Sequence, residues 1–296
     1  MRILVAGKNG QLGQSINKLI NIEAKNKHNP SSNKFIFVDR EELDLSSKNS
    51  IDSYFNNNDK FDIIINCAAY TAVDKAEEEP ELTNQVNHIA VEQLARIANQ
   101  QEAKLIHIST DYVFGGESNK PYLETDKTNT INVYGKTKLA GEQALKEIMP
   151  TDAIIIRTSW VYSEYGNNFV KTMLRLGKER DEISVVSDQI GSPTYATDLA
   201  EAILKIINNK NYLKKQQPTE IYHYSNEGEV SWCNFAKTIF SFKKIECRAS
   251  PITTDQYKTL ARRPKYSLLD NKKIEKEFFI RSKNWKDSLR DCLSRI

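Results

Sequence analysis

Short apolar runs alternate with longer amphipathic segments over the first two thirds of the chain. Five runs of three or four residues are rich in Ile and Val, which is typical of buried strands: residues 3–6, 35–38, 63–65, 105–108 and 154–156. Between them, apolar residues recur every three or four positions, and this spacing predicts helices over residues 12–20, 47–55, 80–99 and 134–148. Strands that are apolar throughout and alternate with helices predict a parallel sheet covered by helices on both faces.

The pattern changes beyond about residue 160. Segments become shorter and more polar, with turn signals at residues 166–168, 191–193 and 226–228. Two polar stretches, residues 24–34 and 208–218, are expected to be exposed loops. We therefore predict an α/β protein: a doubly wound parallel sheet over residues 1–160, completed by part of residues 190–225, followed by a smaller α/β domain over residues 161–296.

Composition and charge exclude several classes of protein. The chain has 42 Lys plus Arg and 39 Asp plus Glu, so its formal net charge is +3 and gives no electrostatic reason to expect nucleic acid or an anionic membrane as partner. No run of about 18 apolar residues exists, so no membrane-spanning segment is expected. The four cysteines are far apart, without the paired spacing of a metal site, and a chain that begins directly with a strand is expected in the cytoplasm.

A glycine-rich loop follows the first predicted strand and opens the first predicted helix. Gly7, Gly10 and Gly13 are spaced G-x-x-G-x-x-G. Glycines permit a tight turn and close backbone approach, and the helix N-terminus offers free N–H groups to a diphosphate. The loop therefore predicts a dinucleotide cofactor on a Rossmann-type sheet, with an ordinary strand–helix turn as the alternative.

Two residues after the second predicted strand bear on which dinucleotide binds. Asp39 is placed to accept hydrogen bonds from the adenosine ribose, whereas the neighbouring Arg40 would favour a 2′-phosphate. Because both are present, the sequence leaves NADH and NADPH open.

A candidate catalytic group follows the fourth predicted strand. Thr110 is expected at the carboxyl end of that strand, and Tyr134 and Lys138 are four residues apart on one helix, so they share a face. An ammonium group lowers the pKa of a nearby tyrosine, which suits transfer of the tyrosine proton to a substrate carbonyl oxygen. Thr110 can donate a hydrogen bond to the same carbonyl oxygen. A surface helix turn is the alternative interpretation of the Tyr-Lys spacing.

Several longer stretches carry a family resemblance. They are residues 7–13, 66–77, 109–114, 132–142, 157–162, 166–175 and 189–194, with a weaker similarity at Arg263-Pro264. On these stretches the chain resembles the extended short-chain dehydrogenase/reductases, and within them the enzymes that reduce a dTDP-linked 4-keto-6-deoxy sugar. The run Asn132 to Glu142 is far more specific than the Tyr-Lys spacing alone.

The resemblance implies roles for individual residues. The implied cofactor contacts are Gly10, Gln11 and Leu12 at the diphosphate, Asp39 at the adenosine ribose, Asp44 and Leu45 at the adenine, and Ala69, Tyr70 and Thr71 towards the nicotinamide. Gly7 of the glycine loop and Arg40 beside Asp39 are further cofactor candidates from the residues themselves. Tyr134 would donate the proton, Lys138 would bind the nicotinamide ribose and lower the pKa of that tyrosine, and Thr110 would assist. Thr110, Asp111 and Trp160 would contact the sugar of a dTDP-sugar substrate, and the product would be dTDP-L-rhamnose.

Some positions depart from the family pattern or stay open. The first helix has Ser15 where magnesium-binding members have a glutamate, so no metal is expected, and Tyr70 stands where many relatives have His. His107 is expected to be a satisfied core histidine, and Asn168 either contacts substrate or caps a helix. Arg263 either reaches the substrate diphosphate or is an ordinary surface arginine.

Two other functions remain open. One is a sugar-nucleotide epimerase or dehydratase of the same family, which would show no net cofactor consumption. The other is a non-catalytic NAD(P)-binding regulatory subunit that resembles the beta subunit of methionine adenosyltransferase. A homodimer is a possible assembly for any of the three.

Overall fold

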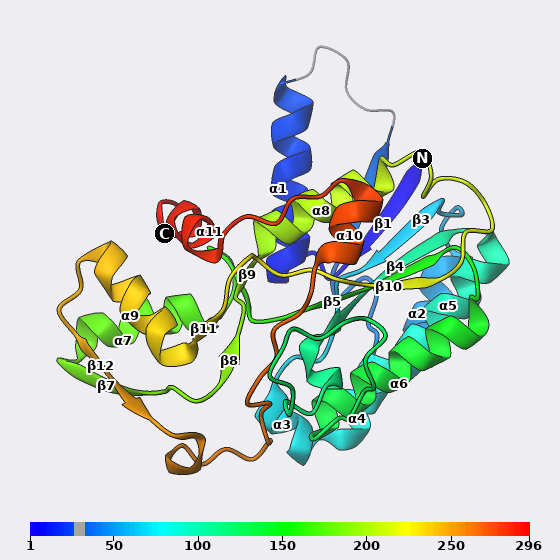
Figure 1. The fold of residues 1–296 in the computed structure, drawn as a ribbon. Coiled ribbons are helices and arrows are strands. Elements are labelled where there is room, and N and C mark those ends of the chain that lie inside the picture. Colours follow the sequence, from blue (N-terminus) through cyan, green and yellow to red (C-terminus); the bar gives the residue numbers. More distant parts are fainter. Residues whose placement is uncertain (27–32) are drawn as a thin grey trace.

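In the computed structural model, which describes residues 1–26 and 33–296, a central parallel sheet lies between two layers of helices (Figure 1). All neighbouring strands of this sheet pair in parallel. In spatial order the strands are β10 (Glu220–His223), β5 (Ala153–Thr158), β4 (Lys104–Thr110), β3 (Ile63–Asn66), β1 (Arg2–Ala6) and β2 (Lys34–Val38). The strand order reverses at β1, and open α/β sheets bind ligands at the carboxyl ends of strands beside such a reversal.

The doubly wound parallel sheet predicted from the sequence is confirmed. Each predicted strand lies within one of β1 to β5. The sixth strand, β10, comes from within residues 190–225 and pairs with β5 at the edge of the sheet.

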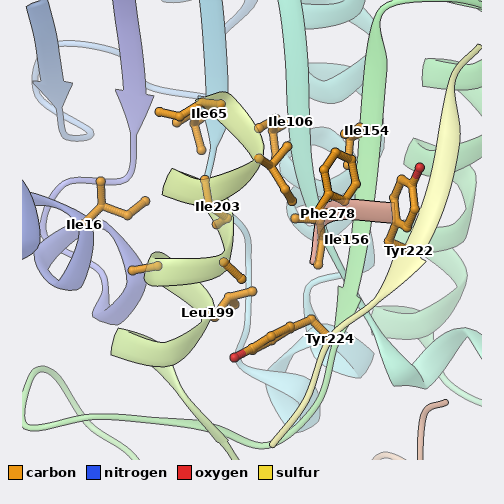
Figure 2. Close-up of a cluster of buried hydrophobic side chains, with 14 of the residues drawn as sticks. Ile16, Ile65, Ile106, Ile154, Ile156, Leu199, Ile203, Tyr222, Tyr224 and Phe278 are labelled. Atoms are coloured by element: carbon orange, nitrogen blue, oxygen red, sulfur yellow. The ribbon is translucent and has the colours of Figure 1, made fainter. Parts of the chain in front are cut away.

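Side chains alternate between the two faces of the sheet, and each face has its own hydrophobic cluster. Ile3 and Val5 of β1 belong to one cluster, and Leu4 and Ala6 belong to the other. The first cluster is covered by α1 (Gln11–Asn26), α8 (Ala196–Ile207) and α10 (Lys272–Phe278), and the second by α2 (Lys48–Asn56), α5 (Ala90–Gln101) and α6 (Val133–Ile148). Figure 2 shows the first cluster, with Ile203 of α8 and Phe278 of α10 against the isoleucines of the strands.

The predicted helices are present, with two corrections. The segment predicted as one helix over residues 80–99 consists of α4 (Pro80–Asn84), a π-helical turn (Gln85–Ile89) and α5, preceded by the short α3 (Val73–Glu78). Residues 24–34 are not one loop, because α1 continues to Asn26 and β2 begins at Lys34; residues 27–32 lie outside the described part of the chain. After Ile20 the only large apolar residue of α1 is Ile22, which is exposed, and this is why spacing alone ended the predicted helix too early.

Most of the elements that follow β5 in the chain lie outside the sheet and form a second part of the molecule, to one side of the sheet (Figure 1). Its hydrophobic cluster includes Val170, Phe235 and Leu289. Its elements are β6 (Val161–Tyr162), α7 (Phe169–Glu179), β7 (Glu182–Val186), β8 (Ile190–Gly191), β9 (Thr194–Tyr195), β11 (Val230–Ser231), α9 (Trp232–Lys243), β12 (Arg248–Ile252) and α11 (Trp285–Leu293). The helices α7, α8 and α9 have 11 or 12 residues, longer than the short segments expected beyond residue 160, and α8 covers the sheet rather than the second part. Of the described helices, none is long and apolar enough to cross a membrane.

Candidate active site

A cavity of about 810 Å³ lies along the carboxyl ends of the sheet strands. Its walls come from the loops that follow β1 to β5 and from α6 and α9. Every site residue predicted from the sequence lines it: Gly7, Gly10, Gln11, Leu12, Asp39, Arg40, Asp44, Leu45, Ala69, Tyr70, Thr71, Thr110, Asp111, Tyr134, Lys138 and Trp160. Residues from five separate loops are therefore brought together in one site.

The glycine loop joins β1 to α1 and leaves no room for side chains. Gly7 has φ +89°, and a Cβ there would lie 3.0 Å from the backbone nitrogen of Ala68. A Cβ on Gly13 would lie 2.3 Å from the Gly7 carbonyl oxygen, which is closer than real Cβ atoms approach. The loop is thus shaped by close backbone packing, and the N-terminus of α1 opens into the cavity as a diphosphate site requires. These residues fit a dinucleotide.

Asp39 and Arg40 both reach the cavity, and both already have ionic partners. Asp39 Oδ2 lies 3.0 Å from Lys8 Nζ, and this hydrogen-bonded pair lowers the pKa of the Asp39 carboxyl. Arg40 Nε lies 3.3 Å from Asp44 Oδ2, and its Nη2 donates to Ser46 Oγ at 3.3 Å. The arginine is largely exposed and keeps free donors for an anionic group.

The loop after β3 is held by the π-helical turn. The Tyr70 N–H donates to Asn87 Oδ1 at 2.9 Å, and Asn87 Nδ2 donates back to the Tyr70 carbonyl at 3.1 Å. The Tyr70 hydroxyl donates to Glu79 Oε2 at 2.6 Å, and this bond raises the pKa of Tyr70 to about 12. The backbone of Ala69, Tyr70 and Thr71 is therefore fixed along the cavity wall.

Tyr134 and Thr110 meet at the inner end of the cavity. Asn132 caps α6 by accepting the Gly135 N–H at 2.7 Å, which starts the helix so that Tyr134 lies in its first turn. Its ring packs edge-on against Tyr112, with ring centroids 5.6 Å apart. Burial raises the pKa of Tyr134 to about 12, and a hydrogen bond with the Thr110 side chain offsets part of that effect. Tyr134 therefore carries its proton at neutral pH.

Lys138 lies one turn further along α6 and is almost fully buried. Its Nζ donates to the Ile108 carbonyl at 2.6 Å and lies 3.2 Å from His107 Nε2. Burial lowers the pKa of Lys138 to about 8. His107 is thus a buried histidine, as expected, but one of its contacts is with a predicted catalytic residue.

Asp111 is a buried carboxyl group in the cavity wall. Its Oδ1 accepts the Thr110 hydroxyl at 3.0 Å, and the Ser267 side chain also hydrogen-bonds the carboxyl group. Burial raises the pKa of Asp111 to about 7, and these hydrogen bonds offset part of that effect. A cavity-lining carboxyl group can hydrogen-bond a hydroxyl of a bound ligand.

Trp160 forms the wall on the side of the second part. Its backbone has φ +48°, a conformation that bulky residues rarely adopt. Its ring lies against Trp232, the first residue of α9, and a Cβ on Gly191 would lie 2.8 Å from the Trp160 ring. Sequence reasoning missed Trp232, because nothing in its local pattern indicated the stacking partner.

The structure shows where Asn168 and Arg263 lie, the two residues whose roles the sequence left open. Asn168 caps α7 by accepting the Lys171 N–H at 3.1 Å, and its Nδ2 donates to Gln11 Oε1 at 2.9 Å, so it caps a helix and holds a cavity residue at once. Arg263 does not line the cavity; its Nη2 donates to Asp74 Oδ2 at 2.7 Å. That bond ties the C-terminal region to α3.

Comparisons with known proteins agree over the whole chain. The family model described as RmlD substrate binding domain matches residues 1–296. The dTDP-4-dehydrorhamnose reductase of Aggregatibacter actinomycetemcomitans is 41% identical over 98% of this chain and 97% of that protein. The spore coat polysaccharide biosynthesis protein SpsK of Bacillus subtilis is 37% identical over 99% of this chain and 96% of that protein.

Solved structures give the same result. A dTDP-4-dehydrorhamnose reductase from Clostridium acetobutylicum has a TM-score of 0.90 and 40% identity, over 100% of this chain and 99% of that one. A dTDP-4-dehydrorhamnose reductase from Bacillus anthracis in complex with NADP has a TM-score of 0.89 and 40% identity, with the same coverage. A UDP-galactose 4-epimerase at 18% identity shares the fold alone. The chain therefore belongs to the dTDP-4-dehydrorhamnose reductase family.

Proposed function

We propose that the protein reduces the 4-keto group of dTDP-4-dehydro-L-rhamnose to give dTDP-L-rhamnose, using NADPH or NADH. The observation that carries this proposal is the meeting of Thr110, Tyr134 and Lys138 in the same cavity as the glycine loop. A redox cofactor and a proton donor are the two requirements for reducing a ketone, and this cavity has residues for both.

The cofactor would be held by the chain's own backbone and by charged side chains at the rim. The N-terminus of α1 would receive the diphosphate, with Gly7, Gly10, Gln11 and Leu12 around it. Asp39 and Arg40 would take the adenosine ribose, and Asp44 and Leu45 the adenine. When bound, the reduced nicotinamide supplies the hydride.

Tyr134 would donate its phenolic proton to the C4 oxygen of the sugar. Its raised pKa keeps that proton in place until negative charge develops on the oxygen. The Thr110 hydroxyl would hydrogen-bond the same oxygen, and the Asp111 carboxyl group would bind a sugar hydroxyl. Trp160 would provide an apolar wall for the face of the deoxysugar that carries the methyl group.

A direct assay separates this proposal from its alternatives. Purified protein is mixed with NADPH and dTDP-4-dehydrorhamnose, and the nicotinamide absorbance is followed. Stoichiometric oxidation of NADPH with formation of dTDP-L-rhamnose supports the reductase. A product without net cofactor consumption would indicate an epimerase or dehydratase, and cofactor binding without any turnover would indicate a regulatory subunit.

Three further expectations stay predictions within this proposal. Residues 1–160 and part of 190–225 would form the cofactor domain and the remainder of 161–296 the substrate domain. The protein would act in the cytoplasm, where nucleotide sugars are made. It would be a homodimer, which size-exclusion chromatography with light scattering tests.

A further inference from the structure

Gln11 lies where the glycine loop meets the wall on the substrate side. It is the first residue of α1, and it lines the same cavity as residues 166–168. In the proposed reductase its backbone N–H belongs to the helix N-terminus that receives the diphosphate, because the first N–H groups of a helix have no partner within the helix. Its side chain is directed elsewhere.

The side-chain amide of Gln11 is bound to the segment 161–168. Its Nε2 donates to the Val161 carbonyl at 3.2 Å, and its Oε1 accepts from Asn168 Nδ2 at 2.9 Å. The Ser163 hydroxyl also donates to Oε1 at 2.9 Å. One side chain of α1 therefore holds three positions of a segment that is at least 150 residues away along the chain.

The partners fix the orientation of this amide. Asn168 Oδ1 accepts the Lys171 N–H at 3.1 Å, so Asn168 Nδ2, which can only donate, is the atom that faces Gln11. The Val161 carbonyl, in turn, can only accept. The two lone pairs of Gln11 Oε1 face Asn168 and Ser163, so this oxygen is fully committed to the segment.

The segment forms a tight turn that lies against Gln11. Ser163 is fully buried, and its Oγ accepts the Tyr165 N–H at 3.0 Å. Gly166 has φ +59°, and a Cβ there would lie 3.5 Å from Gln11 Cγ. The position of the turn, and with it the position of Gly166 in the cavity wall, therefore depends on the Gln11 side chain.

A second contact joins the same two elements further along α1. Lys18 Nζ is 2.8 Å from Glu164 Oε1, and the largely buried Glu164 also accepts the Tyr195 hydroxyl at 3.0 Å. Neither Lys18 nor Glu164 lines the cavity. Loss of the Gln11 amide should therefore leave the two elements joined and loosen the part of the segment that borders the cavity.

We propose that Gln11 is a positioning residue for the substrate side of the cavity: its side chain fixes residues 161–168 against the glycine loop and does not hold the cofactor. This role deepens the proposed function and rests on it for the identity of the two ligands. Trp160 and residues 166–168 line the cavity, so their distance from the glycine loop sets how closely a sugar is held to the cofactor.

Gln11→Met tests the contact with the segment on the protein without ligands. Methionine keeps the length and the helix propensity of glutamine but lacks the amide. Hydrogen exchange followed by mass spectrometry compares peptides that cover residues 161–171 in the variant and in the wild type. We expect exchange there to be about 5-fold faster in the variant, as for the loss of about one hydrogen bond. Unchanged exchange would overturn the inference, whichever ligands the protein binds.

Calorimetric titration then separates the two ligands. We expect the Kd for dTDP-L-rhamnose, the product of the proposed reaction, to rise about 3- to 10-fold in Gln11→Met, while the Kd for NADPH stays within about 2-fold of wild type. A weaker affinity for NADPH with an unchanged affinity for dTDP-L-rhamnose would assign the side chain to the cofactor and overturn the inference. A wild type that does not bind dTDP-L-rhamnose would refute the proposed function, whereas hydrogen exchange would still decide whether Gln11 holds the segment.

Ser163→Ala tests the same contact from the side of the segment. Ser163 does not line the cavity, so its replacement should affect a bound ligand only through the segment. The variant is expected to speed exchange over residues 161–171 and to raise the Kd for dTDP-L-rhamnose, as Gln11→Met does. A Kd that rises in Gln11→Met alone would mean that Gln11 contacts the sugar nucleotide directly, and it would overturn the positioning role.

The matched control is Gln93→Met. Gln93 is also half-buried, and its Nε2 donates to the Lys48 carbonyl at 3.1 Å and to Asp52 Oδ1 at 2.6 Å, which joins α5 to α2 away from the cavity. The control is expected to leave exchange over residues 161–171 and both Kd values unchanged. An equal change in the control, or equal losses of affinity for both ligands in Gln11→Met, would indicate a general loosening of the fold and overturn the inference.

Discussion

Trp160 and Trp232 stack face to face, with ring centroids 3.5 Å apart and planes 10° from parallel. Trp160 follows β5, and Trp232 begins α9, so the stack joins the sheet to the second part of the molecule at the cavity wall. The left-handed backbone at Trp160 costs energy, and the stacking offsets part of that cost while it aims the ring into the site.

Replacement of Trp160 by Phe tests whether this ring contacts the sugar. Phe can still stack on Trp232 but loses the breadth of the indole and its N–H group. We expect the Michaelis constant for the sugar nucleotide to rise about 2- to 10-fold, as the loss of an aromatic contact predicts, with little change in Tm or in cofactor affinity.

The comparison variant for Trp160 is Trp285→Phe. Trp285 is buried in the second part against Phe235 and does not line the cavity. Its truncation is expected to lower Tm and to leave the Michaelis constant unchanged. A large drop in Tm with unchanged substrate affinity in Trp160→Phe would assign Trp160 to the core instead.

Cofactor choice depends on Arg40 if its guanidinium receives a 2′-phosphate. Arg40→Ala is then expected to weaken NADPH binding by about 1–3 kcal/mol, as for the loss of a charge-assisted hydrogen bond, and to leave NADH binding almost unchanged. Fluorescence titration of both cofactors measures this. Arg96→Ala removes another exposed arginine, one that pairs with Glu92, and serves as control. Equal losses for NADPH and NADH in Arg40→Ala would make Arg40 a structural residue.

Asp111 makes stability depend on pH. Its pKa is about 7 in the folded protein, against 3.8 for an unperturbed group, so between about pH 4 and 7 the folded state holds a proton that the unfolded state has lost. Stability should therefore fall as pH rises through this window. Asp111→Asn cannot ionise, and urea unfolding should show a loss between pH 5 and pH 8 that is smaller by on the order of 3 kcal/mol. An identical pH dependence in wild type and variant would contradict the raised pKa.

Removal of one partner of the buried ion pair between Arg157 and Glu142 should destabilise the protein strongly. Arg157 donates from Nε to Glu142 Oε1 at 2.9 Å and from Nη2 to Oε2 at 2.6 Å, and both side chains are almost fully buried. Glu142→Gln leaves the arginine uncompensated, and urea unfolding should show a loss of about 3–5 kcal/mol. Glu102→Gln breaks the exposed pair with Lys215 and should cost less than about 1 kcal/mol. Similar losses of unfolding free energy in the two variants would mean that an unpaired buried charge at Arg157 costs no more than an unpaired exposed charge.

The sequence predicted the sheet because the sheet depends on local signals. Apolar runs such as residues 63–65 identify buried strands, and the residues that follow them must meet where parallel strands end. The glycine loop and the Tyr134–Lys138 spacing are likewise short-range patterns, and the order of the strands explains why these candidate residues line one cavity. Other candidates, such as Trp160, came only from the family resemblance, and the roles of all of them stay predictions.

What the sequence could not predict depends on contacts between distant segments. His107 lies in an apolar strand, and only the packing of α6 brings Lys138 to its Nε2. Two other contacts likewise join distant residues: Trp232 stacks on Trp160, and Arg157 pairs with Glu142. The local sequence around each residue does not indicate its partner. These contacts arise from tertiary packing, which spacing along one element does not encode.

The proton donor itself is tested by Tyr134→Phe. The ring packs against Tyr112, so Phe keeps the packing and removes only the hydroxyl that bonds with Thr110. If Tyr134 supplies the proton, turnover should fall by about 100-fold or more, whereas cofactor affinity and Tm should stay close to wild type. NADPH oxidation, fluorescence titration and thermal unfolding measure the three quantities. Tyr162→Phe removes a buried hydroxyl that has no partner among the described residues, outside the cavity, and should leave turnover unchanged. Near-normal turnover in Tyr134→Phe would mean that another group, with Asp111 the first candidate because its pKa is about 7, gives the proton to the sugar.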